Sequence, residues 1–212
     1  MEQLREILDN FMVLEGLDGS GTTTQAGLLA DRCKRERIPY HVTSEPTTGP
    51  VGTLIRRFLR GEEPVHPDTM TLLFAADRSE HLNAPEVGIR ARCELGELVI
   101  SDRYLFSSLA YQTIACDSDF VQAANSHFPF PRRLVYVDVP VEECVRRLAQ
   151  RTHREIYELV DFQARVQERY EEILATYADC GMEIIRVDGT VSAGEIAEMV
   201  WKMVAGRPIR GV

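Results

Sequence analysis

The sequence has no long apolar run, and its first residues, Met1 to Asp9, are charged rather than apolar. A helix that crosses a bilayer needs roughly 18–20 predominantly apolar residues, so we expect neither a membrane partner nor a secretory leader. The five cysteines also lack the spacing of a metal site, because no two of them form a C-x-x-C pair. Scattered cysteines are typical of buried, reduced thiols, so we predict a cytoplasmic protein without a disulfide framework or a zinc site.

Positive charge is scarce, and lysine is scarcer still. The chain has 24 basic and 33 acidic residues, which gives a formal net charge of -9. Only two of the basic residues, Lys34 and Lys202, are lysines. Nucleic-acid binding needs a basic face to meet the phosphates, so we expect no nucleic-acid partner. Arginine must therefore supply any cationic chemistry.

What is present is an ordinary globular composition, 44% hydrophobic and 27% charged over 212 residues. This length is typical of one domain, so we predict a single domain over residues 1–212. Short apolar runs alternate with amphipathic stretches, and continuous apolar runs suit strands that are covered on both faces. The strands are predicted around residues 11–14, 40–42, 98–100, 134–137 and 184–187.

Helical stretches separate these runs. Apolar side chains recur at steps of three and four over residues 162–177 and over residues 141–148, and residues 24–37 form a third helical stretch. Strands that alternate with helices imply right-handed crossovers. We therefore predict an α/β fold in three layers, with a five-stranded parallel sheet flanked by helices.

A glycine-rich loop follows the first predicted strand. It reads GLDGSGTT and keeps seven of the eight positions of the phosphate-loop (P-loop) pattern G-x-x-x-x-G-K-[ST]. Glycines let backbone N–H groups turn toward phosphate, and the following helix adds its positive N-terminal end. The residues predicted to bind the ATP phosphates are Gly16, Leu17, Asp18, Gly19, Ser20, Gly21, Thr22 and Thr23.

Thr22 stands where that pattern has lysine. A lysine would place a positive charge on the β- and γ-phosphates, whereas Thr22 offers only a hydroxyl group. Thr23 keeps the hydroxyl group that binds Mg²⁺. The loop therefore predicts nucleotide binding, while turnover needs a cation from elsewhere. A tight glycine turn without a ligand is the alternative interpretation.

Polar residues also follow the second and third predicted strands, in Thr43-Ser44-Glu45-Pro46 and Ser101-Asp102-Arg103-Tyr104. In an open parallel sheet, ligands gather beyond the carboxyl ends of the strands. We predict that Asp102 holds Mg²⁺ or its waters and that Arg103 bridges an acceptor phosphate. An internal Asp102–Arg103 pair is the alternative.

Three segments together resemble bacterial thymidylate kinases: residues 11–25 (FMVLEGLDGSGTTTQ), 73–81 (LFAADRSEH) and 101–112 (SDRYLFSSLAYQ). Their order and separation also fit, and the likeness extends over essentially the whole chain. The resemblance implies a P-loop sheet that transfers a phosphoryl group from ATP to thymidine monophosphate (dTMP), in dTTP biosynthesis. It also implies Mg²⁺ as cofactor and a homodimer.

The resemblance further implies the residues of the acceptor site. Asp18 and Arg103 would be catalytic, with Asp18 near the dTMP sugar and the metal. Phe74 and Arg78 lie four residues apart and share a helix face, where a ring and a guanidinium group can hold a flat base. The predicted dTMP-binding residues are Glu45, Pro46, Arg56, Phe74, Arg78, Arg103, Ser108, Tyr111 and Gln112.

An arginine-rich stretch follows the fourth predicted strand. Arg147, Arg151 and Arg154 are four and three residues apart, which places them on one helix face. Such a run is usually a solvated face. In the family that the sequence resembles, this position holds a lid over ATP with catalytic arginines. We therefore predict an arginine-rich, mobile lid over roughly residues 149–160, in which Arg151 or Arg154 replaces the missing lysine.

The sequence is compatible with three functions, and an active ATP:dTMP phosphotransferase is the leading one. Thr22, together with Ser44 in place of a family arginine, favours a nucleotide-binding homologue with weak or lost turnover. A kinase for another nucleoside monophosphate is the third. The presence of Phe74, Arg78 and Arg103 favours the first.

Overall fold

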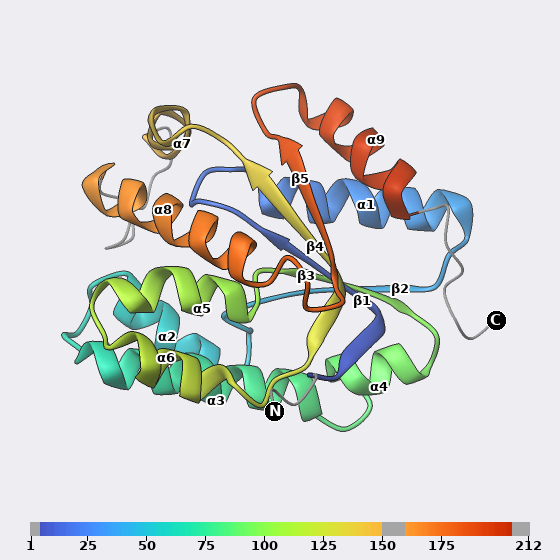
Figure 1. Cartoon of the computed structure of the whole chain (residues 1–212). Coiled ribbons are helices and arrows are strands. Elements are labelled where there is room, and N and C mark those ends of the chain that lie inside the picture. The colour runs from blue at the N-terminus through green and yellow to red at the C-terminus, as the bar shows by residue number, and fades with distance from the viewer. Residues whose placement is uncertain (1–4, 150–159, 205–212) are drawn as a thin grey trace.

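The computed structural model describes residues 5–149 and 160–204. Its centre is a five-stranded sheet with the order β2-β3-β1-β4-β5, in which all neighbouring strands are parallel (Figure 1). Each predicted apolar run lies inside one strand, so the prediction of a five-stranded parallel sheet is confirmed. The strands are β1 (Ile7–Glu15), β2 (Tyr40–Ser44), β3 (Leu98–Asp102), β4 (Phe130–Asp138) and β5 (Glu183–Asp188).

Helices cover both faces of the sheet and complete the three layers. Helices α1 and α9 lie side by side on one face, and α4, α5 and α8 cover the other (Figure 1). Between them, the β1 residues Phe11 to Leu14 are at most 1% exposed, which is why this strand is apolar without alternation. The helices are α1 (Thr22–Glu36), α2 (Pro50–Leu59), α3 (Pro67–Asn83), α4 (Ile89–Glu94), α5 (Leu105–Tyr111), α6 (Ser118–Asn125), α7 (Val141–Leu148), α8 (Val160–Thr176) and α9 (Ala193–Val204), with a 3-10 turn at Gln112–Ile114.

Helix α8 matches the amphipathic stretch predicted over residues 162–177. Its buried face contains Val166, Tyr170 and Ile173, as the periodicity indicates. It also contains Gln163, a polar residue that is completely buried. The apolar pattern therefore located the helix but not the polar group that it carries into the interior.

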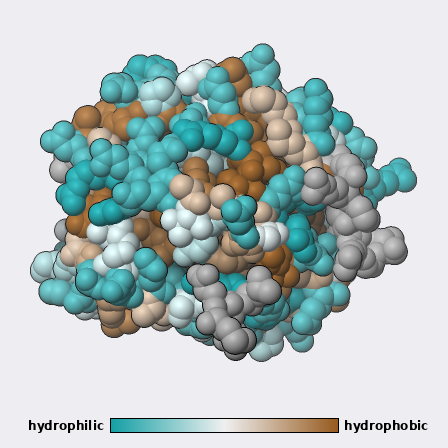
Figure 2. Space-filling model, viewed as in Figure 1, coloured by the Kyte–Doolittle hydropathy of each residue, from teal (hydrophilic) through white to brown (hydrophobic). Residues whose placement is uncertain are grey.

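The face of the molecule in Figure 2 is mainly hydrophilic, and the apolar side chains that reach it are interspersed with polar ones. Among the described residues, no helix combines the length and the apolar character that a membrane crossing requires. Leu72, Val87 and Leu95 are the most exposed of the large apolar side chains that the structure describes.

All five cysteines are free thiols. Only Cys33 and Cys144 are buried, whereas Cys93, Cys116 and Cys180 are half-buried. The prediction of buried thiols is therefore right for two of the five and wrong for three, because a scattered cysteine carries no sequence signal for its depth.

Candidate active site

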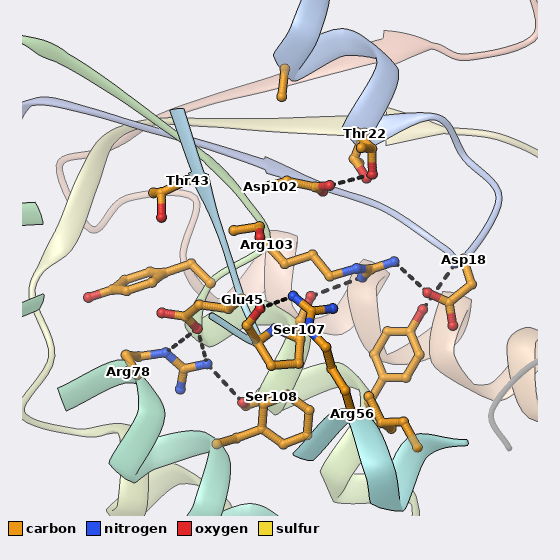
Figure 3. A pocket seen from close by; sticks show the side chains of 18 of the residues that line it. Asp18, Thr22, Thr43, Glu45, Arg56, Arg78, Asp102, Arg103, Ser107 and Ser108 are labelled. Carbon is orange, nitrogen blue, oxygen red and sulfur yellow. Dashed lines mark hydrogen bonds and ion pairs between the residues drawn. The ribbon is translucent and has the colours of Figure 1, made fainter. Parts of the chain in front are cut away.

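A cavity of about 600 Å³ opens at the carboxyl edge of the sheet (Figure 3). Its walls come from the P-loop between β1 and α1, from the ends of β2 and β3, and from helices α1, α2, α3 and α5. The predicted site residues that line it are Asp18, Gly19, Gly21, Thr22, Thr23, Glu45, Pro46, Arg56, Phe74, Arg78, Asp102, Arg103, Ser108, Tyr111 and Gln112. The predicted loop residues that are not part of its lining are Gly16, Leu17 and Ser20.

The P-loop turns on Gly19 and Gly21, whose φ angles of 88° and 100° lie in the left-handed region that favours glycine. A Cβ atom at Gly19 would also lie 2.7 Å from the carbonyl oxygen of Cys144 in α7. Leu17 and Ser20 are each 1% exposed and support the loop from the protein interior. The loop is therefore held tightly at the start of α1.

Thr23 and Asp102 face each other at the edge of the sheet. Thr23 Oγ1 donates to Asp102 Oδ2 at 2.5 Å, while the buried Oδ1 of Asp102 has no hydrogen-bond partner in the protein. A hydroxyl and a carboxylate with spare acceptor capacity are oxygen ligands of the kind that Mg²⁺ prefers. In the described part of the chain, no group of three or more His, Cys, Asp and Glu residues could enclose a metal. A cation held by Thr23 and Asp102 would thus need phosphate oxygens and waters as further ligands.

Arg103 points into the cavity from the turn between β3 and α5, and it pairs with Asp18 rather than with its neighbour Asp102. Its Nη2 atom lies 2.6 Å from Asp18 Oδ1, and Nη1 donates to the carbonyl oxygen of Gly16 at 3.0 Å. The φ angle of Arg103 is 74°, which is uncommon for a residue with a side chain. The structure thus directs this guanidinium group toward the P-loop.

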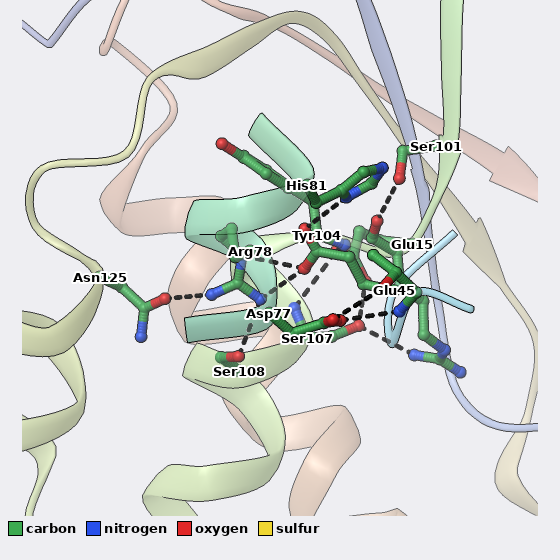
Figure 4. Close-up of polar contacts among 12 residues, drawn as sticks. Glu15, Glu45, Asp77, Arg78, His81, Ser101, Tyr104, Ser107, Ser108 and Asn125 are labelled. Atoms are coloured by element: carbon green, nitrogen blue, oxygen red, sulfur yellow. Dashed lines mark hydrogen bonds and ion pairs between the residues drawn. The ribbon is translucent and has the colours of Figure 1, made fainter. Parts of the chain in front are cut away.

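Arg78 projects from α3 and is held by three side chains (Figure 4). Its Nε and Nη2 atoms lie 2.9 and 2.7 Å from Glu45 Oε2. Nη2 also donates to Ser108 Oγ at 3.0 Å, and Nη1 donates to Asn125 Oδ1. Because Arg78 is only 1% exposed, its guanidinium group has a fixed orientation at the cavity wall.

The other predicted acceptor residues lie around the same end of the cavity. Phe74 is one helical turn before Arg78 on α3, and both residues line the cavity. Arg56 reaches from α2 and donates to the carbonyl oxygen of Pro46. The hydroxyl of Tyr111 accepts a hydrogen bond from the backbone N–H of Asp18 at 3.1 Å. An apolar ring, cations and hydroxyl groups thus converge on one space.

Four buried polar residues outside the predicted set support this site: Glu15, Asp77, Asn125 and Gln163. Asp77 accepts from the backbone N–H and the hydroxyl of Thr47 at 2.7 and 2.6 Å, which fixes the β2–α2 connection. Gln163 Nε2 donates to Asp18 Oδ2 at 3.2 Å. Only Glu15 carries a usable signal, because a charged residue directly after a buried apolar run marks a strand end.

A family model described as thymidylate kinase matches residues 14–199. The chain belongs to the thymidylate kinase family. It is 42% identical over 201 residues to the putative thymidylate kinase of Aeropyrum pernix, a match that covers 90% of this chain and 95% of that protein. The putative thymidylate kinase of Treponema pallidum is 40% identical over 185 residues, or 86% and 88% of the two chains. The probable thymidylate kinase of Methanococcus aeolicus is 39% identical over 168 residues, or 79% and 80%.

Thymidylate kinases are phosphotransferases, and the position of Thr22 in this member of the family is therefore important. Thr22 lines the cavity and is 5% exposed. Arg151 and Arg154, the predicted substitutes for the lysine, lie outside the described residues. Their catalytic role stays a prediction, as does the assignment to the bacterial group of the family.

The side chain of Arg147 is half-buried, whereas an arginine-rich stretch would usually be fully solvated. Its Nη1 atom approaches the carbonyl oxygens of Gly19 and Ser20 at 3.5 and 3.3 Å, and Nη2 donates to the carbonyl oxygen of Gly189 at 3.0 Å. Glu143 accepts from Nε of Arg147 at 2.7 Å. Arg147 thus joins the P-loop of this thymidylate kinase family member to the β5–α9 connection.

Proposed function

We propose that this protein transfers the γ-phosphoryl group of ATP to dTMP and releases ADP and dTDP, a step of dTTP synthesis. One observation carries the proposal: a single cavity is lined both by the P-loop residues Gly21 and Thr23 and by Phe74 and Arg78. A phosphoryl donor and an acceptor with a flat base can therefore lie in the same space, as in-line transfer requires. Membership of the thymidylate kinase family supports the same reaction.

The donor phosphates lie, in this proposal, against residues 16–23. The backbone N–H groups of the P-loop and the N-terminal end of α1 supply positive potential there. Thr23 and Asp102 would hold Mg²⁺, and the unpartnered Oδ1 of Asp102 fits that role. The bound ion supplies charge neutralisation on the phosphate oxygens.

The acceptor lies, in this proposal, at the other end of the cavity. Arg103 binds the dTMP phosphate and, together with Asp18, orients it toward the γ-phosphorus. Phe74 stacks on the base, and Arg78 donates to its edge. The remaining contacts with dTMP come from Glu45, Pro46, Arg56, Ser108, Tyr111 and Gln112. An oxygen of the dTMP phosphate attacks directly, so no covalent protein intermediate is needed.

The cation that replaces the P-loop lysine is proposed to come from a lid over roughly residues 149–160. Guanidinium groups suit this role because they are always charged and bind phosphate oxygens in pairs. Arg151 and Arg154 are the candidates. We also propose a single domain over residues 1–212, a homodimer and a cytoplasmic location.

Thr22 is the specific observation that favours a second function, nucleotide binding with weak or lost turnover. A coupled assay of ADP release with dTMP, dUMP and the purine monophosphates separates the possibilities. We expect ADP and dTDP in equal amounts with dTMP and much less product with the purines. Binding of dTMP without dTDP formation under any divalent metal would refute the kinase function. Faster turnover of another monophosphate would reassign the acceptor.

A further inference from the structure

Glu15 is a buried acid at the end of the central strand β1, where it is 1% exposed. Its Oε1 accepts from the backbone N–H groups of Tyr104 and Ser107 at 2.9 and 3.2 Å. Its Oε2 accepts from the hydroxyl group of Ser107 at 2.6 Å (Figure 4). It also accepts from the hydroxyl group of Tyr170 at 2.8 Å. Burial raises the pKa of Glu15, while the charge of Arg103 and these hydrogen bonds act in the opposite direction.

Two of the residues that donate to Glu15 follow closely after Arg103 in the chain. Tyr104 directly precedes α5, and Ser107 lies in the first turn of this helix. Glu15, at the end of strand β1, therefore caps the N-terminal end of α5. A non-glycine residue at positive φ is strained and persists only where its surroundings fix it. Ser107 Oγ also lies 3.0 Å from Arg103 Nη1. The contacts of Glu15 therefore fix both the backbone and the guanidinium group of Arg103.

Tyr170 extends this network to helix α8. Its hydroxyl group lies 3.1 Å from Ser107 Oγ and 3.5 Å from Arg103 Nη1, besides its hydrogen bond to Glu15. The ring is buried, at 1% exposed. Helix α8 also carries Gln163, which donates to Asp18, the ion-pair partner of Arg103. One helix thus contacts the network at two points.

We propose that Glu15 is a positioning residue for phosphoryl transfer: it holds Arg103 at the geometry that binds the acceptor phosphate, and Tyr170 couples that geometry to α8. Glu15 touches the cavity only through other residues, since the residues that line it include Arg103, Tyr104 and Ser107 but not Glu15. The inference rests on the proposed function, because it assigns Arg103 to the acceptor phosphate.

A purely structural role, in which Glu15 only caps α5, predicts a different pattern of defects. A capping residue affects folding stability whether or not Arg103 is present. A positioning residue loses its effect on catalysis once the group that it positions is gone, so the two substitutions are then non-additive. The cycle of Glu15→Gln, Arg103→Ala and the double variant separates these roles. The amide that Glu15→Gln introduces carries no charge with which to attract the guanidinium group of Arg103.

The readouts are kcat/KM for dTMP, dTMP affinity by calorimetry and the midpoint of thermal unfolding. We expect Glu15→Gln to lower kcat/KM by about 10–100-fold, in the range that a misplacement of about 1 Å causes. In the Arg103→Ala background, the same change should cost less than about threefold. Effects that multiply would overturn the inference, as would a fully active Glu15→Gln enzyme. Glu183→Gln, at the start of strand β5 and thus at the amino end of the sheet, is the matched control. It should leave kcat/KM and dTMP affinity unchanged.

If Glu15→Gln does not fold, the same cycle is run with Tyr170→Phe, which removes one hydroxyl group and keeps the ring. Additivity with Arg103→Ala would again overturn the inference. The proposed function fails separately, when the unmodified protein binds dTMP but forms no dTDP. In that case the cycle is read from dTMP affinity alone, and an unchanged affinity in Glu15→Gln would overturn the positioning role.

Discussion

Arg103 Nη2 lies 2.6 Å from Asp18 Oδ1, and this ion pair joins the β3–α5 turn to the P-loop. The guanidinium group also donates to the carbonyl oxygen of Gly16. Lysine in place of Arg103 would keep the charge but lose the planar pair of donors. We expect Arg103→Lys to lower kcat/KM for dTMP by about 10²–10³-fold, the usual effect of losing one preorganised transition-state contact. Arg186→Lys, on the exposed side of β5, is the control, and equal activity of the two variants would contradict the assignment.

Arg78→Ala should weaken dTMP binding by about 1–3 kcal/mol, because it removes a charged hydrogen-bond donor from the base site. It should also destabilise the fold by about 3–5 kcal/mol, since it leaves the carboxylate of Glu45 buried without its cation. The double variant Arg78→Ala/Glu45→Gln should regain part of the stability but none of the affinity. Urea unfolding and calorimetry measure the two effects. A collapse of ATP affinity with normal dTMP affinity would show that the base site lies elsewhere.

Removal of Mg²⁺ with a chelator should abolish dTDP formation and leave dTMP binding largely intact. Asp102→Asn should raise the Mg²⁺ concentration for half-maximal activity by about tenfold or more, because it removes an anionic oxygen next to the ion. Asp138→Asn, at the carboxyl end of strand β4, is a control of the same type. An unchanged Mg²⁺ requirement in Asp102→Asn would remove Asp102 from the metal site.

Arg151→Ala or Arg154→Ala should lower kcat by about 10²–10³-fold at saturating ATP while dTMP affinity is unchanged. Thr22→Lys in the impaired variant should restore part of the rate, because it returns a cation to the P-loop. Arg146→Ala is the control, since Arg146 is exposed and pairs with Glu143. Normal kcat in both alanine variants would mean that another group, such as Arg103, carries the charge.

The buried thiols should resist alkylation in the native protein. Burial raises the pKa of Cys33 to about 11 and that of Cys144 to about 12. At pH 8 only about one Cys33 thiol in a thousand is then the reactive thiolate. This fraction grows about tenfold for each unit by which the pH is raised toward the pKa. Mass spectrometry after brief treatment with iodoacetamide should find both residues unlabelled, and all five cysteines labelled in urea. Rapid labelling of Cys144 in the native state would contradict its position behind Gly19.

The sheet and the P-loop could be predicted because their signals are local. A strand covered on both faces needs consecutive apolar residues, and Phe11 to Leu14 supply them. The turns at Gly19 and Gly21 require φ angles that other residues avoid, so the glycines mark the loop directly. The polar strand ends followed from topology, since parallel strands present the same edge.

The supporting contacts of the site could not be predicted, because their partners are distant in the sequence. Asn125 and Arg78 are 47 residues apart, and Glu15 and Tyr170 are 155 apart. No periodicity relates such pairs, and only packing brings them together. The same is true of Arg147. The spacing of the arginines predicts a shared helix face, but not the three main-chain carbonyl oxygens, of Gly19, Ser20 and Gly189, that the guanidinium group of Arg147 approaches in the fold.

That position of Arg147 has an electrostatic consequence for the P-loop. A peptide group is a dipole, and the carbonyl oxygen of Ser20 belongs to the same peptide as the N–H group of Gly21, a residue that lines the cavity. The guanidinium group near this oxygen adds a positive potential behind that peptide, on the side away from its N–H pole. In a loop that has threonine instead of lysine, part of the attraction for an anion therefore arises in the main chain. It depends on the docking of α7 rather than on any side chain of the loop itself.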